Sequence, residues 1–211
     1  YPQWGDTTYG IVEITNFDSR GVFRLLKKLI EETMDAVVAA VKGVDNIVDA
    51  VRETVRDQLK GALKDVSDVA GQGMESIVAV VTGSLKSVAS IGGSLVDVSA
   101  GTIRGVVRGV SDTGGDVVGA IRQTASTLIE EANTLGQDLG EVAVGAVRGT
   151  ISSAEKVGVD VSDATKAAVT SVIKAADGIG DEAGKTVRDA LLSAAALPRD
   201  TVEKIIKGSE K

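Results

Sequence analysis

The chain has 211 residues, a formal net charge of −7, and neither Cys nor His. The absence of these two residue types excludes disulfides, thiol nucleophiles and the usual zinc sites, and it removes the commonest general base. Because the charge balance is acidic, binding to a nucleic-acid backbone is not expected. Only 2% of the residues are aromatic, and all of these lie within the first 23 positions, so the rest of the chain must pack through aliphatic side chains.

Residues 1–18 do not share the pattern of the remaining chain, and we expect a short extended arm that carries most of the aromatic side chains. A helix is predicted to begin at Asp18 or Ser19, with basic side chains on one face of its first turns. Aromatic side chains beside a basic helix indicate an element that joins subunits or anchors the chain; the alternative is an arm packed on its own first helix. The predicted docking residues are Trp4, Tyr9, Phe17, Arg20, Phe23, Arg24 and Lys28.

Residues 19–197 are predicted to form a long helical repeat region. Apolar residues recur every 11 positions, as in Val44, Val55 and Val66, and a charged track follows the same spacing. Eleven residues correspond to three helical turns of about 3.67 residues, which is typical of a straight or slightly right-handed helical assembly. A β-strand, with its two-residue alternation, would not produce this period.

Glycine recurs every 22 residues on top of this pattern, at Gly92, Gly114, Gly136, Gly158 and Gly180. Each glycine could end one helix, with a following acidic residue beginning the next. Alternatively, the helix continues and each glycine admits the backbone of a neighbouring helix. We favour the continuous helix, because the 11-residue phase holds across every glycine, and we expect a break only at 112–116.

Three further glycines lie four residues apart on one helical face and predict a groove for a closely packed helix. Together with the glycines above, they form the predicted set of helix-packing residues: Gly92, Gly101, Gly105, Gly109, Gly114, Gly136, Gly158 and Gly180. Residues 198–211 begin with Pro198, which ends the long helix, and they are expected to form a short C-terminal helix and tail.

The predicted fold is therefore all-α: a long amphipathic helix, or a long helical hairpin, in an elongated bundle or coiled coil with a short extended N-terminal arm. No uncharged run reaches the length of a membrane span, and the apolar segment 76–96 is expected to be buried in protein. The chain begins at Tyr1 without an initiator methionine, which favours a processed chain in a secreted or cell-envelope location.

The period of residues 44–197 resembles that of exchangeable apolipoproteins and perilipins, of polyester-granule phasins, and of late-embryogenesis-abundant helical proteins. This resemblance implies an amphipathic helix on a lipid or granule surface. The residues themselves favour a non-enzymatic structural protein, without metal or cofactor, that assembles with copies of itself or a larger protein complex through its small-residue stripes into a bundle, tube or filament. The alternative function is a coat protein of a lipid, droplet or storage-granule surface.

Overall fold

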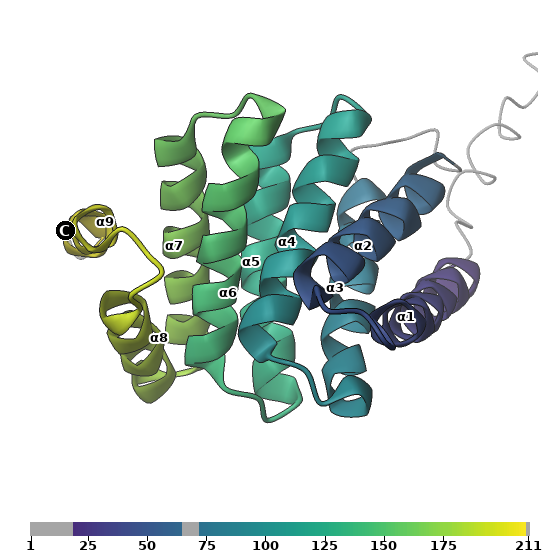
Figure 1. Ribbon diagram of the computed structural model, residues 1–211, viewed down its shortest axis with the longest axis horizontal. Helices are drawn as coiled ribbons and strands as arrows, with labels where there is room; N and C mark the ends of the chain where they lie inside the picture. The colour runs from purple at the N-terminus through teal and green to yellow at the C-terminus, as the bar shows by residue number, and fades with distance from the viewer. Residues whose placement is uncertain (1–18, 65–71, 210–211) are drawn as a thin grey trace, which may run out of the picture.

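The computed structural model describes residues 19–64 and 72–209, and within these ranges the chain is entirely helical and loop, without a strand (Figure 1). The prediction of an all-α fold is confirmed. The expected extended arm at 1–18 lies outside the described residues. The helices are α1 (Ser19–Val41), α2 (Ile47–Lys64), α3 (Gln72–Ile91), α4 (Leu95–Asp112), α5 (Val117–Thr134), α6 (Leu139–Ala154), the 3-10 helix η1 (Glu155–Val157), α7 (Val161–Ile179), α8 (Asp181–Ser193) and α9 (Arg199–Ser209).

The prediction of one helix, or a single hairpin, across 19–197 is wrong. The longest described helix, α1, has 23 residues, and most of the others have 16 to 20. The expected break at 112–116 is present, since α4 ends at Asp112 and α5 begins at Val117. It is one of a series of similar turns rather than the exception.

The turn glycines end the helices through their backbone conformation. Gly114, Gly136 and Gly158 have φ angles of 73°, 65° and 75°, in the left-handed region that glycine enters without a steric penalty. After Gly114, the N–H of Gly115 donates to the carbonyl of Val110 at 3.0 Å. Equivalent bonds follow Gly136 and Gly158, so each glycine completes a Schellman-type turn that satisfies carbonyls at the end of the helix.

An aspartate then begins the next helix at three of these turns. The side chains of Asp116, Asp138 and Asp160 each accept a hydrogen bond at 2.9 Å from the backbone N–H three residues later. These bonds satisfy donors that the first helical turn leaves without a partner. Glycine at the end and aspartate at the start therefore make a compact reversal of the chain.

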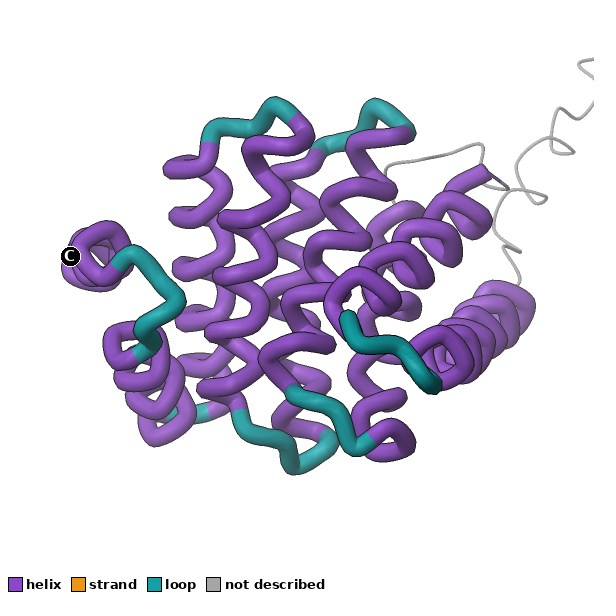
Figure 2. The backbone as a smooth tube through the Cα atoms, in the orientation of Figure 1, coloured by secondary structure: helices purple, strands orange, loops and turns teal. Residues whose placement is uncertain are grey.

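The helices pack as two layers. The even-numbered helices α2, α4, α6 and α8 form one layer, and the odd-numbered helices form the other; each helix contacts the helix two places along the chain. In Figure 1, α4 and α6 overlie α5 and α7. Figure 2 shows the connecting loops at the two ends of these central helices.

The core lies between and within the layers and consists of aliphatic side chains. Ile103, Ile121, Leu128 and Val147 are fully buried, and many alanines fill the space around them. The sequence predicted that the apolar stripe of the repeat would be covered by another molecule. In the structure it is largely covered by helices of the same chain. Burial of this surface supplies the main stabilisation of the fold.

Helix α3 illustrates this internal coverage. Residues Gly73–Ile91 are the one described segment that is long and apolar enough to cross a membrane, and 56% of its apolar window is buried inside the molecule. The helix packs against α1 and α5. Its apolar composition is therefore accounted for by burial in protein, and the described residues hold no clear membrane span.

Candidate functional site

The first candidate surface, the stripe of glycines on α4, is already occupied. An added Cβ at Gly101 would lie 2.7 Å from Cβ of Val51, and one at Gly105 would lie 2.7 Å from Cβ of Val55. Both valines belong to α2. The stripe does receive a closely packed helix, but that helix is α2 of the same chain. The stripe is therefore not open to a helix of another copy.

A second stripe, which sequence reasoning missed, repeats this packing between α6 and α4. An added Cβ at Gly145 would lie 2.8 Å from Cβ of Ser99, and one at Gly149 would lie 2.6 Å from the carbonyl oxygen of Ala100. Gly145 and Gly149 follow Gly101 and Gly105 at an offset of 44 residues. This offset of 44 residues, twice the 22-residue spacing, is the feature of the sequence that could have predicted the second stripe.

The glycines spaced by 22 residues are not helix-packing residues. A Cβ added at any of them would meet no atom within 4 Å, so no neighbouring backbone approaches them. Their function is to reverse the chain at the turns. This corrects the prediction for Gly92, Gly114, Gly136, Gly158 and Gly180.

The exposed apolar surface gathers on α1. The side chains of Phe23 and Leu25 are 72% and 68% exposed, whereas the next most exposed large hydrophobic side chain, Val44, reaches 43%. Because they are two positions apart in a helix, the two side chains flank the outer face of α1 on opposite sides. Large exposed apolar side chains that rim a polar face indicate an interaction surface. We call the exposed face of α1, from Phe23 to Ala36, the α1 surface.

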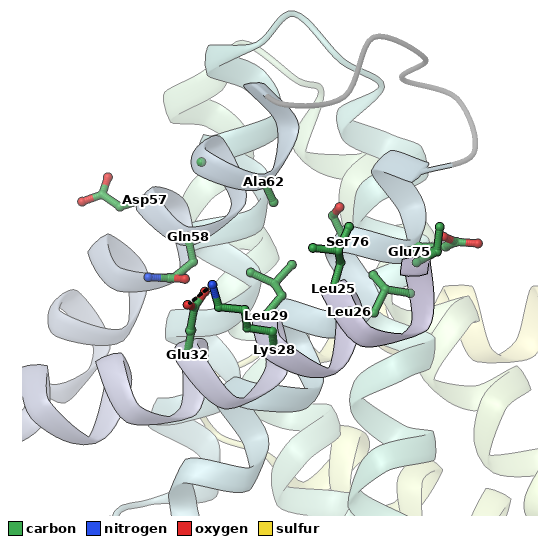
Figure 3. Close-up of a pocket in the computed structure, with 12 residues that line it drawn as sticks. Leu25, Leu26, Lys28, Leu29, Glu32, Asp57, Gln58, Ala62, Glu75 and Ser76 are labelled. Carbon is green, nitrogen blue, oxygen red and sulfur yellow. Dashed lines mark ion pairs between the residues drawn. The ribbon is translucent and has the colours of Figure 1, made fainter. Parts of the chain in front are cut away.

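Two grooves flank the α1 surface. One, with a volume of about 420 Å³, lies between α1, α2 and α3, and Figure 3 shows Leu25, Leu26 and Leu29 projecting into it from α1. The other, of about 530 Å³, lies between α1, α3 and α5 and includes Phe23 and Ile30 in its lining. The lining of the second groove is mostly apolar, whereas the first groove combines the leucines of α1 with polar and charged side chains such as Asp57 and Glu75. Both grooves therefore offer apolar surface beside the exposed side chains of α1.

Charge along the α1 surface changes sign at its middle. The exposed cations Arg24, Lys27 and Lys28 come first, and the exposed acids Glu31, Glu32 and Asp35 follow. Within the helix, the Lys28 ammonium lies 3.3 Å from the Glu32 carboxylate, and Lys27 lies 4.0 Å from Glu31. Such solvent-exposed pairs contribute little to stability, so they can exchange partners.

The structure places part of the predicted docking set on this surface. Phe23, Arg24 and Lys28 are exposed on α1. Trp4, Tyr9 and Phe17 lie outside the described residues, and only the backbone of Arg20 is described. Sequence reasoning missed Leu25, because a leucine beside Leu26 and Leu29 reads as part of a buried helical face.

Comparison with known proteins adds no relative. No model of a known protein family matches the chain, and no curated protein matches it. The resemblance to apolipoproteins, phasins and late-embryogenesis-abundant proteins therefore rests on periodicity alone.

Proposed function

We propose that this protein is a non-enzymatic structural protein that pairs with a second copy of itself through the α1 surface. The observation that carries the proposal is the exposure of Phe23 and Leu25, at 72% and 68%, the highest of the large hydrophobic side chains in the part of the chain that the structure describes. Burial of these side chains contributes roughly 1.5–3 kcal/mol each. Counted over two copies, this offsets a large part of the cost of association.

The charge order of α1 favours a second copy as the occupant. A two-fold axis between Leu29 and Ile30 makes two α1 helices antiparallel, so that the basic half of each lies against the acidic half of the other. Phe23 then lies at the level of Ala36 of the second copy, at the edge of the contact face, where the small alanine side chain leaves room for an aromatic ring. The charged oppositions are Arg24 with Asp35, Lys27 with Glu32, and Lys28 with Glu31.

A lipid or granule coat is the second candidate function. Phe23 and Leu25 next to Arg24, Lys27 and Lys28 resemble the arrangement of a helix lying at a membrane interface. The acids in the second half of α1 oppose binding to an anionic lipid surface. Moreover, in a coat protein the long apolar stripe would face lipid, whereas here it faces other helices of the chain.

The test of pairing is the molecular mass of the full chain across a range of concentrations, measured by sedimentation equilibrium. The double variant Phe23→Ser, Leu25→Ser should weaken the dimer at least about 100-fold, because 1.4 kcal/mol corresponds to a factor of ten. Its helical circular dichroism should be unchanged, because both side chains are already exposed. A wild-type chain that stays monomeric at every concentration contradicts the proposal.

A charge-exchange experiment tests the antiparallel arrangement itself. The variants Lys27→Glu, Lys28→Glu and Glu31→Lys, Glu32→Lys should each lose self-association through repulsion between like charges, and mixing them should restore a mixed dimer. The matched control is Lys166→Glu, Lys174→Glu, which changes the same charge on exposed positions of α7. A monomer that binds anionic vesicles through Phe23 and Leu25 would instead establish the coat function.

A further inference from the structure

A third groove, away from the α1 surface, is lined by cations. It has a volume of about 200 Å³ and lies between α2, α4 and the end of α6 with η1. None of the described side chains that line it is acidic, although the whole chain has a net charge of −7. Its lining residues are Arg52, Arg56, Arg104, Arg108, Ser153, Lys156 and Val157.

The close packing of α4 on α2 brings these cations together. Arg52 and Arg56 are one turn apart on α2, and Arg104 and Arg108 are one turn apart on α4. Between the two rows, an added Cβ at Gly105 would lie 2.7 Å from the carbonyl oxygen of Arg52. Without a side chain at this position, the two helices approach closely enough for four guanidinium groups to line one groove.

Carboxylates outside the groove leave its charge only partly balanced. Arg52 pairs with Asp49 at 2.8 Å and with Glu53 at 3.1 Å, and both of these carboxylates are neighbours on α2 itself.

Two of the other three arginines also pair with a carboxylate of their own helix, and the third has no carboxylate partner in the described part of the chain. Arg56 pairs with Asp57 at 2.8 Å, and Arg108 pairs with Asp112 at 3.0 Å, again within one helix. Within the described ranges, neither Arg104 nor Lys156 forms an ion pair. Since each guanidinium carries five N–H donors, all four arginines retain donors for an added anion.

We propose that this groove binds a phosphate-bearing ligand. Guanidinium groups match phosphate oxygens in a two-point geometry, and charge-assisted hydrogen bonds of this kind are among the strongest in proteins. The volume is below that of a site for a drug-sized molecule, so the groove holds a phosphate or pyrophosphate group rather than a ring system. Ser153 donates its hydroxyl hydrogen to the backbone, at 2.8 Å from the carbonyl oxygen of Gly149, so the cations carry the recognition.

The experiment is calorimetric titration of the full-length chain with inorganic pyrophosphate at low ionic strength. The variant Arg104→Gln, Lys156→Gln should bind at least tenfold more weakly, because it removes the two cations without a carboxylate partner in the described residues. Both side chains are at least partly exposed, so the fold should survive, and circular dichroism checks this. The matched control Arg122→Gln, Lys166→Gln removes the same charge from exposed positions of α5 and α7 and should bind as the wild type does.

A second arm distinguishes a soluble phosphate compound from a lipid headgroup. Vesicles of phosphatidylcholine containing phosphatidylglycerol are compared with vesicles of phosphatidylcholine alone, using the same variants. Pyrophosphate binding lost only in the groove variant supports a soluble ligand, and anionic-vesicle binding lost only in that variant supports a headgroup. A wild-type chain that binds neither probe overturns the proposal, as does equal weakening in the control, which would indicate net charge rather than the groove.

Discussion

Glycine serves opposite physical purposes in the interior of the α2–α4–α6 layer and in the turns at the ends of the helices. In the layer, Gly101 and Gly105 have ordinary helical backbone and no room for a side chain. In the turns, Gly114 and Gly136 have ample room but positive φ angles of 73° and 65°. The layer needs glycine for its small volume, and the turns need it for its backbone freedom.

The comparison teaches that the two glycine spacings in this sequence have different physical causes. Four-residue spacing marks the glycines that face a helix, and 22-residue spacing marks those that end one. The cost of adding one methyl group should therefore differ in both size and origin between the two regions.

The largest effect is expected for Gly105→Ala, in the layer. The added Cβ would stand 2.7 Å from both Cβ of Val55 and the carbonyl oxygen of Arg52, and the backbone atom cannot move aside as a flexible side chain could. Overpacking of this kind costs about 1–3 kcal/mol, and we expect the upper end of that range. Urea unfolding monitored by circular dichroism measures the loss.

The matched control for this change is Gly61→Ala. Gly61 lies in α2 with ordinary helical backbone, and a Cβ there would meet nothing within 4 Å. Alanine should raise the free energy of unfolding by roughly 0.5–1 kcal/mol through its better helix propensity. If Gly105→Ala were as stable as the wild type, α4 and α2 could not be packed as closely as described.

A smaller effect is expected for Gly136→Ala, in a turn. The methyl group meets no neighbour, so the loss comes only from forcing an L-residue into the left-handed region, at about 1–2 kcal/mol. Gly136→Asn should lose less, because asparagine tolerates this conformation better. If the two variants lost equal free energy of unfolding, the cause would be a steric clash and not the backbone conformation. The turn glycines would then not differ from those in the layer.

The cap that follows this glycine should contribute about 1 kcal/mol. Asp138→Ala removes the acceptor for the N–H of Glu141, a bond of 2.9 Å, and leaves that donor without its partner. Thermal unfolding measures the change. Asp138→Asn keeps an acceptor oxygen and serves as the control, so it should remain within a few tenths of a kcal/mol of the wild type.

The smallest effect concerns an ion pair at the edge of the layer. The Asp112 carboxylate lies 3.2 Å from the Lys60 ammonium and 3.0 Å from Arg108 Nε. Its hydrogen bond with Lys60 is the largest influence that lowers the pKa of Asp112, and the charges of Arg108, Lys60 and Arg56 lower it further. Because the pair is partly exposed, Asp112→Asn should cost less than about 1 kcal/mol near neutral pH.

The pH dependence of this difference has a definite sign. A carboxylate whose pKa is lower in the folded state stabilises the fold fully above its unfolded pKa, about 3.9 for aspartate. That contribution is lost as the pH falls through the lowered folded value of Asp112. The stability gap between the wild type and Asp112→Asn should therefore narrow in acid, and a gap that widens would show that the ion pair is not stabilising.

The sequence predicts the class of fold well and the length of its helices badly, for one physical reason. Between Leu95 and Asp116, one helix and its turn together occupy 22 residues, which is twice the 11-residue period. The apolar phase is therefore preserved across the turn at Gly114, just as it would be in a continuous helix. The pattern alone could not separate the two arrangements, although the aspartates after the glycines favoured turns.

The α1 surface could be predicted from the sequence to a greater extent than the basic groove between α2 and α4. The charges and Phe23 on α1 are local in sequence, so their exposure on one helix was predictable. The basic groove joins Arg52 and Arg56 to Arg104 and Arg108, which lie about 50 residues away along the chain. Only the packing of α4 on α2 brings these rows together, and no periodicity indicates which helices become neighbours.

The alternation of turns has a practical consequence for manipulating this protein. The loops between α4 and α5 and between α6 and α7 lie on one edge of the molecule, and the loops between α3 and α4 and between α5 and α6 lie on the opposite edge (Figures 1 and 2). Exposed turns tolerate insertions better than packed helices do. Since the chain contains no cysteine, a single introduced thiol or inserted tag at a turn gives each edge its own handle for a dye, a crosslinker or a solid support.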